Sequence, residues 1–188
     1  VSDMRFVESA AREVGSVLRA GNLCVLESTS PPYSTRMVEK IVSEVSGLAP
    51  EQFMTAHCPE RIIPGRMLIE LRENDRIIGS NRPESAQFAK EIYEKVVTGG
   101  TIRLTDDLTA EMCKLTENTF RDINIAYANE LSKVCDRLGI DVFKLIELAN
   151  CHPRVNVHSP GVGVGGHCIA VDPWFIHEKF EDITPLIY

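Results

Sequence analysis

Apolar residues alternate between helical and strand-like spacing along the first part of the chain. Helical spacing predicts helices over residues 3–20, 34–46 and 84–97, the first of them ended by Gly21. Short apolar runs predict strands at residues 23–26, 53–56, 76–78 and 101–104. This alternation is typical of an α/β fold with a parallel sheet and crossover helices. Because it opens on a helix without a preceding strand, we expect half of such a sheet.

The pattern changes at Thr105. Residues 108–138 contain neither Gly nor Pro, Asp106 or Asp107 can cap their start, and Gly139 can end them. They predict one helix on the order of 45 Å long, at about 1.5 Å per residue. A shorter helix over residues 141–150, a Gly/Pro-rich loop and a last helix beginning near Trp174 follow.

Composition and charge exclude several classes of protein. The net charge is −7 and Lys and Arg are scattered, so we expect no nucleic-acid partner and no anionic membrane surface as a partner. No apolar run approaches the roughly 18 residues that span a bilayer. No basic stretch is followed by an apolar core and a cleavage site, so we expect no signal peptide. The six cysteines include no C-x-x-C pair, which speaks against structural zinc and favours a reduced, cytoplasmic setting.

Two candidate sites directly follow predicted strands. Residues 27–32, ESTSPP, lie where doubly wound sheets bind ligands, although Ser and Pro also form ordinary turns. Residues 57–65 begin with His57, Cys58 and Glu60. Adjacent His and Cys side chains point in opposite directions on an extended chain, so a metal site fits poorly. A general base, Glu60, is the better interpretation.

A third candidate lies on the long helix. Four polar residues spaced 3, 4 and 3 apart share one face, namely Glu111, Lys114, Asn118 and Arg121. Such a stripe is usually solvated. Here the other faces are also rich in apolar residues, so a buried stripe with a ligand as partner is the alternative.

The fourth candidate is the glycine-rich run 160–174. Gly161, Gly163 and Gly166 satisfy G-x-G-x-x-G, but the run lacks the preceding strand and the early helix of a dinucleotide site. Its glycines instead permit close approach of the backbone to a ligand. The run ends on Cys168, a nucleophile candidate that would need electropositive help, which Lys114 could supply. A buried Cys after a flexible loop is the alternative.

Together, these motifs resemble the UDP-glucose/GDP-mannose dehydrogenase family over essentially the whole chain. The matching motifs are ESTSPP, HCPERIIPGR, AEMCKLTENTFRDINIAYANEL and GVGVGGHCIAVDPWF. Within the family, the sequence is most similar to the members that act on UDP-N-acetyl-D-mannosamine. The resemblance implies the C-terminal half of a Rossmann-like parallel sheet, a long central helix and a small α-helical dimerisation domain. The implied boundaries are 1–105 for the NAD-binding part, 106–175 for the central domain and 176–188 for the start of the nucleotide-sugar domain.

The resemblance also implies roles for individual residues. Cys168 is the nucleophile, Lys114 and Asn118 stabilise negative charge on the substrate oxygen, Asp172 assists Cys168 or the hydrolytic water, and Glu60 acts in acid–base steps. Thr29 and Ser28 contact NAD. The implied substrate contacts are Arg61, Arg121, Arg154 and Gly165, since an anionic nucleotide-sugar favours Arg. UDP-glucose members carry a second Glu where this chain has Pro64, so that acid is absent or moved.

The implied reaction is a four-electron oxidation. One hydride transfer converts the C6 alcohol of the UDP-sugar to an aldehyde, a Cys thiohemiacetal forms, and a second transfer leaves a thioester that water hydrolyses to the uronate. The alternatives are UDP-glucose or GDP-mannose as substrate, a one-step β-hydroxyacid dehydrogenase, and a non-catalytic dimerisation module. We expect a homodimer through the central helix. We also expect this chain alone to be inactive and to bind NAD poorly, because the family's dinucleotide loop lies upstream of Val1.

Overall fold

A computed structural model describes residues 2–62, 65–166 and 168–187 of the chain. The chain divides into two compact units, Val1–Lys114 and Leu115–Tyr188. The first contains the sheet and its helices. The second contains most of the long helix and the segments after it.

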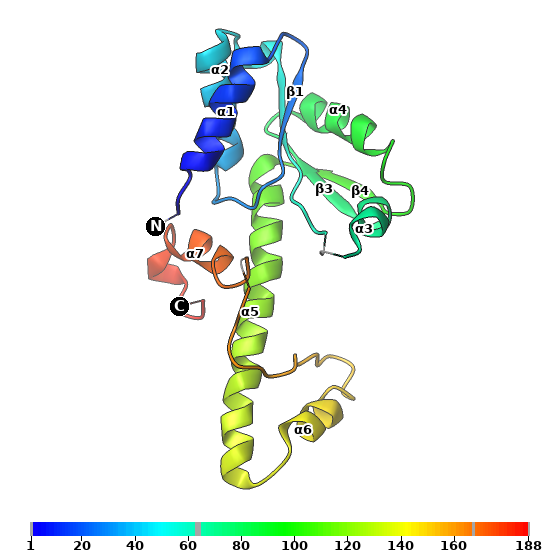
Figure 1. The fold of residues 1–188 in the computed structure, drawn as a ribbon, viewed down its shortest axis with the longest axis vertical. Coiled ribbons are helices and arrows are strands. Elements are labelled where there is room, and N and C mark those ends of the chain that lie inside the picture. The colour runs from blue at the N-terminus through cyan, green and yellow to red at the C-terminus, as the bar shows by residue number, and fades with distance from the viewer. Residues whose placement is uncertain (1, 63–64, 167, 188) are drawn as a thin grey trace. The chain divides into compact units, whose positions relative to one another are not determined.

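The first unit is built on four strands in the order β1-β2-β3-β4 (Figure 1). The strands are β1 (Leu23–Leu26), β2 (Met54–His57), β3 (Arg76–Gly79) and β4 (Ile102–Thr105). Along the chain, α1 (Arg5–Val17) precedes β1. Between the strands lie α2 (Ser34–Ser46), a 3-10 turn (Pro50–Gln52), α3 (Met67–Glu73) and α4 (Pro83–Tyr93). The α/β class and the position of every strand agree with the sequence pattern within one residue.

The sheet is only mostly parallel. β1 pairs with β2 and β3 with β4 in parallel, as predicted, but β2 pairs with β3 antiparallel through His57 and Gly79. The connection between them contains α3, a short helix that the sequence pattern missed and that buries none of its residues. Because α3 does not pack on the sheet as a crossover helix would, the connection does not return the chain in the same direction.

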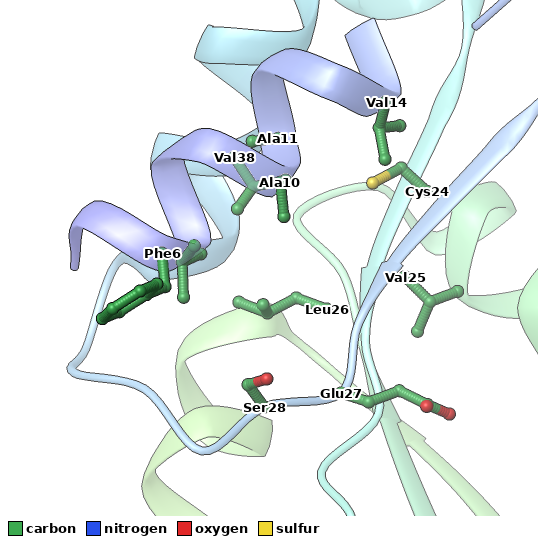
Figure 2. A pocket seen from close by; sticks show the side chains of 11 residues that line it. Phe6, Ala10, Ala11, Val14, Cys24, Val25, Leu26, Glu27, Ser28 and Val38 are labelled. Carbon is green, nitrogen blue, oxygen red and sulfur yellow. The ribbon is translucent and has the colours of Figure 1, made fainter. Parts of the chain in front are cut away.

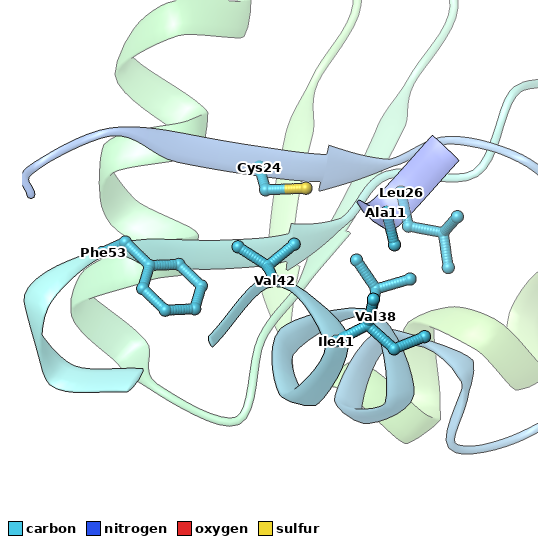
Figure 3. Packing of buried hydrophobic residues seen from close by; sticks show 7 residues of the cluster. All are labelled: Ala11, Cys24, Leu26, Val38, Ile41, Val42 and Phe53. Atoms are coloured by element: carbon cyan, nitrogen blue, oxygen red, sulfur yellow. The ribbon is translucent and has the colours of Figure 1, made fainter. Parts of the chain in front are cut away.

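Strand alternation divides the core of the first unit into two faces. Cys24 and Leu26 of β1 contribute to a cluster with Ala11, Val42 and Phe53, as Figure 3 shows. Their neighbours Leu23 and Val25 pack instead against the cluster of Ala56, Cys58, Ile78, Ala86 and Ala89. Helices α1 and α2 therefore cover one face of β1 and α4 covers the other.

Gly79 ends β3 where the long helix begins. A Cβ atom at this position would lie 2.3 Å from the carbonyl oxygen of Asp106 and 2.4 Å from the Cβ of Ala110. The close approach of the first turn of α5 (Asp107–Leu138) therefore requires glycine at the end of β3.

The second unit is helical. Helix α5 continues into it, and α6 (Val142–Ala149) packs against α5 through Ala128, Cys135, Val142 and Ile146. Asp141 caps α6 by accepting hydrogen bonds from the amides of Phe143 and Lys144. The chain then passes through the glycine-rich run to α7 (Asp172–His177) and a last 3-10 turn (Glu181–Ile183). Helix α7 begins two residues before the predicted Trp174, because Pro173 is well accommodated in a first helical turn.

Candidate active site

The last residues of the four strands lie in one row. Leu26 is the register partner of His57, His57 of Gly79, and Gly79 of Thr105. The carboxyl ends of all four strands therefore meet along one line, despite the antiparallel pair. The loop with Ser28 and Thr29 and the loop with Glu60 both leave the sheet there, at the position where α/β sheets bind ligands.

The loop after β1 is held by a buried carboxylate. Glu111 of α5, 1% exposed, accepts hydrogen bonds from the amides of Tyr33 and Thr35, both at 2.7 Å, and from the Thr35 hydroxyl at 2.6 Å. Glu111 thereby supplies hydrogen-bond acceptors to backbone N–H groups at the start of α2, which have no partner within the helix. Burial raises the pKa of Glu111, an effect that these hydrogen bonds partly oppose. The first member of the predicted polar stripe is thus a structural anchor for this loop.

A second carboxylate of α5 reinforces the attachment. Asp107 is fully buried and forms a bidentate ion pair with Arg36 of α2, at 2.6 and 3.0 Å. The loop that carries Ser28 and Thr29 is consequently fixed on both sides, by β1 and by the start of α2. Ser28 is exposed and Thr29 is half-buried.

Glu60 is held by three donors. Its carboxylate accepts hydrogen bonds from the amides of Arg61, at 2.6 Å, and Ile62, at 2.8 Å, and forms an ion pair of 3.3 Å with Arg76. The Arg76 side chain is fully buried, whereas 41% of the Glu60 side chain is exposed. Arg76 was not identified from the sequence, where it reads only as the first residue of a strand. Its charge within a buried strand is the signal that could have revealed it.

The structure argues against a role for Cys58 as a nucleophile. Burial raises the pKa of Cys58 to about 11, although Arg76 opposes the shift. Burial likewise lowers the pKa of the neighbouring His57 to about 4. Among residues 2–62, 65–166 and 168–187, no group of three or more His, Cys, Asp or Glu side chains is arranged to hold a metal ion.

In the second unit, Asn118 and Asp172 come together. Both are 4% exposed, and the Asn118 amide donates a hydrogen bond to the Asp172 carboxylate at 2.5 Å. Cys168 precedes Asp172 by one turn, and its carbonyl accepts the amides of Val171 and Asp172 at 2.9 Å each. The Cys168 thiol is free and exposed. The structure thus joins three of the predicted catalytic residues through hydrogen bonds in one unit.

The remaining predicted residues are distributed between the units. Lys114 is half-buried and is the last residue of the first unit, one helical turn before Asn118. Arg61 also lies in the first unit and donates to the carbonyl of Asp75 at 3.2 Å. Arg121, Arg154 and Gly165 are exposed and belong to the second unit. Pro64, where related enzymes carry a second acid, lies outside the described residues.

An apolar hollow of about 370 Å³ lies beside β1 (Figure 2). Helices α1 and α2 and strand β1 line it with apolar side chains such as Phe6, Val14 and Leu26, and Glu27 and Ser28 lie where β1 ends. Ser28 is the predicted site residue on its wall.

In the described part of the chain, no helix is both long and apolar enough to cross a membrane.

Both units match one family of proteins. Residues 1–97 match the NAD binding domain of the UDP-glucose/GDP-mannose dehydrogenase family, and residues 108–186 match the central domain of that family.

Individual relatives are similar over almost the whole chain. An NDP-N-acetyl-D-galactosaminuronic acid dehydrogenase of Ralstonia solanacearum is 53% identical over 98% of the chain, and a UDP-N-acetyl-D-mannosamine dehydrogenase of Yersinia pestis is 49% identical over 99%. The chain spans 45% and 46% of the length of these two relatives. A solved UDP-D-ManNAc dehydrogenase of Pyrococcus horikoshii superposes with a TM-score of 0.94 at 44% identity, covering 98% of this chain and 44% of that one.

Proposed function

Because the chain belongs to the UDP-glucose/GDP-mannose dehydrogenase family, we propose that it forms part of an NAD-dependent enzyme that oxidises the C6 alcohol of a UDP-sugar to the uronate. The observation that carries this proposal is the buried pair of Asn118 and Asp172, joined by one hydrogen-bonded turn of the backbone to Cys168, whose thiol is free. The one-step β-hydroxyacid dehydrogenase considered as an alternative needs no such thiol.

The preferred substrate in this proposal is UDP-N-acetyl-D-mannosamine. The relatives named above share, by their names, a nucleoside diphosphate that carries an N-acetylated hexose. Identities of 53% and 49% do not separate galactosamine from mannosamine compounds. The choice of mannosamine rests on the motifs around residues 151–175. UDP-glucose and GDP-mannose are the alternatives.

The residues at the carboxyl end of β1 fit a nicotinamide cofactor. A carboxamide and a ribose bind through hydrogen bonds, and the exposed Ser28 and half-buried Thr29 offer hydroxyl groups there that can donate and accept them. The loop that carries them is fixed by Glu111 and by the ion pair of Asp107 with Arg36. When bound, NAD⁺ supplies the acceptor for the hydride in each of the two oxidations.

Each proposed catalytic residue then has a separate task. Glu60 accepts the proton of the C6 hydroxyl, in an orientation that its two amide donors and Arg76 fix. The Cys168 thiolate adds to the carbonyl carbon of the aldehyde and forms a thiohemiacetal, which the second oxidation converts to a thioester. Asp172 assists the water that hydrolyses the thioester. The products are the carboxylate and the regenerated thiol.

Lys114 and Asn118 serve the negatively charged oxygen in these steps. They are spaced i, i+4 on α5, so their side chains share one face of the helix. A fixed ammonium and a fixed amide are the donors that an oxyanion requires. The hydrogen bond from Asn118 to Asp172 uses one N–H of the amide, and the amide has a second N–H to donate.

We also propose that α5 forms a homodimer interface. Phe120, Tyr127 and Val134 recur every seventh residue on α5, and each is at least 50% exposed. Seven-residue spacing is that of one of the two apolar positions that each heptad of paired helices contains. Residues 106–175 would then form the domain that carries both the catalytic thiol and the dimer contact. A non-catalytic dimerisation module is the alternative function.

The test is the stoichiometry of the full-length protein. With UDP-N-acetyl-D-mannosamine and excess NAD⁺, we expect two NADH for each sugar consumed and the uronate as product. One NADH for each sugar would contradict the four-electron reaction. Faster oxidation of UDP-glucose or GDP-mannose would contradict the choice of substrate.

A further inference from the structure

Three asparagines on α5 hold the segments on either side of the glycine-rich run. Asn118 binds the Asp172 carboxylate at the end of the run. Asn129 accepts the amide of Gly161 at 2.8 Å, at its start. Asn124 uses both ends of its amide, donating to the carbonyl of Asn156 at 3.0 Å and accepting the amide of His158 at 2.8 Å. Asparagine is a poor helix former, so its use here implies a task that outweighs this cost.

The outer two anchors are in register on the helix. Asn118 and Asn129 are eleven residues apart, which is three turns, so both side chains lie on the same face. They are separated along the helix axis by about 16 Å, at roughly 1.5 Å per residue. The segment between Gly161 and Asp172 contains ten residues, which could reach about twice that distance when extended. The segment between the two anchors is therefore longer than the distance that it has to span.

The glycines of this loop contribute little to fixing it. A methyl group at Gly161, Gly163 or Gly165 would meet no heavy atom within 4 Å in the described chain. Gly166 alone among these glycines requires its residue type for conformational reasons, with φ at +105°. Besides the half-buried side chains of Val164 and Ala170, the loop that carries Cys168 is held by the hydrogen-bonded anchors at its two ends.

We propose that Asn129, together with Asn124, is a positioning residue that closes the Cys168 loop against α5. This inference rests on the proposed function. Without the Asn129 anchor, the segment that carries Cys168 would be held only by Asn124 at His158 and by Asn118 at Asp172. The thiolate would then stand less precisely at the aldehyde carbon when the aldehyde forms. A small displacement of a reacting group is costly in rate. The first oxidation does not use the sulfur atom, so it would continue.

The consequence is a change in product as well as in rate. In the intact loop, the thiolate captures the aldehyde, the second oxidation removes a hydride, and water releases the carboxylate. In the loosened loop, aldehyde that escapes capture leaves after one hydride has been transferred. The yield of NADH for each sugar consumed then falls from two toward one, and free aldehyde accumulates.

The experiment uses the full-length enzyme with UDP-N-acetyl-D-mannosamine, excess NAD⁺ and hydroxylamine to trap aldehyde as its oxime. Asn129→Ala removes the acceptor for the Gly161 amide, and we expect an NADH yield clearly below two with oxime formed. Asn129→Asp retains an acceptor oxygen and should restore a yield near two. Asn22→Ala is the matched control, since Asn22 also accepts one backbone amide, that of Arg19 at 3.0 Å, in the first unit. Its yield should stay at two.

The outcomes are distinct. A yield of two in Asn129→Ala, with all rates lowered equally or unchanged, would overturn the positioning role. A wild-type yield other than two would contradict the proposed function instead. If Asn129→Ala does not fold, Asn124→Asp takes its place, because it keeps the acceptor for His158 and loses the donor to Asn156. If Asn124→Asp also fails to fold, or folds and gives two NADH, the anchors serve the fold alone and the inference is wrong.

Discussion

The amide of Asn118 donates a hydrogen bond to the carboxylate of Asp172 across 54 residues of sequence, and both side chains are buried. A buried amide and a buried carboxylate each need a partner, and here each supplies one to the other. The contact ties the first turn of α7 to α5. It also joins the residue proposed to stabilise the substrate oxygen to the residue proposed to assist Cys168.

Asn118→Ala should therefore lower both stability and activity. Loss of one donor to a buried carboxylate costs about 1–3 kcal/mol in free energy of unfolding, which urea titration measures. Loss of an oxyanion donor lowers kcat by about 10²–10³-fold. Asn22→Ala, which removes an exposed side-chain hydrogen bond, should change neither quantity appreciably. Wild-type kcat in Asn118→Ala would exclude the oxyanion role.

Cys168→Ser should nearly abolish uronate formation in the full-length enzyme. The serine hydroxyl is a far weaker nucleophile than a thiolate, so the aldehyde is not captured. Cys151 provides the matched control, because it is also exposed and lies in the same unit. Cys151→Ser should keep wild-type uronate formation, measured by chromatography of the products. Equal uronate from Cys168→Ser and wild type would rule out the covalent mechanism.

Gly165→Ala should affect substrate binding and leave the fold intact. A methyl group at Gly165 meets no heavy atom within 4 Å in the described chain, and its φ lies outside the left-handed region. We expect an unchanged melting temperature and a KM for the UDP-sugar raised about tenfold, which is about 1.4 kcal/mol of binding free energy.

Gly79→Ala gives the opposite pattern. Its methyl group would lie 2.3 Å from the Asp106 carbonyl oxygen, so α5 would have to move. Overpacking of this kind costs about 1–3 kcal/mol, which thermal unfolding would register. If Gly165→Ala lowered the melting temperature as much as Gly79→Ala and left KM unchanged, Gly165 would serve the fold and would not contact a ligand.

Val134→Glu should convert a dimer of the full-length protein to a monomer. Val134 lies on the exposed stripe of α5 with Phe120 and Tyr127, and a charge in an apolar seam carries a desolvation cost. Light scattering measures the mass. Leu68→Glu, at a residue of α3 that is 72% exposed, should leave the mass unchanged. A wild-type monomer would refute the dimer itself.

The sequence revealed the elements better than their pairing. Helices such as α2 and α5 were predicted almost to the residue, because long periodic segments bounded by turn residues carry a strong signal. The antiparallel pairing of β2 with β3 was not predicted, since strand direction depends on whether the connecting segment packs on the sheet. Helix α3 was missed because Met67, Leu68 and Ile69 are consecutive apolar residues that remain exposed, which helical periodicity does not describe.

The sequence indicated the chemistry of the site but not its support. Cys168, Asn118 and Asp172 were identified from motifs, and the structure joins them. Glu111 shared the polar stripe with Asn118, yet the structure uses it to anchor α2. Spacing on a helix places side chains on a face, but only the fold determines which partner each side chain meets.

The buried side chain of His57 should make the folded protein less stable in acid. Burial lowers its pKa to about 4, and the backbone of Leu26 and the Asp107 carboxylate oppose the shift only in part. The unfolded chain therefore binds a proton near pH 6.5, whereas the folded chain resists it down to about pH 4. Between these values the unfolded state holds more protons, so stability falls as the pH is lowered through this window.

His57→Leu should remove this part of the acid sensitivity. At about 1.36 kcal/mol per pKa unit, the difference in unfolding free energy between wild type and variant should change by at most about 3 kcal/mol from pH 7 to pH 4. Urea unfolding at several pH values measures it. On acidification the variant should lose less unfolding free energy than wild type, because leucine cannot take up a proton. His152→Leu, at an exposed histidine, should follow the wild-type slope. His57 is completely buried. If the unfolding free energy of His57→Leu fell with pH as steeply as that of wild type, His57 would not be a source of the acid sensitivity.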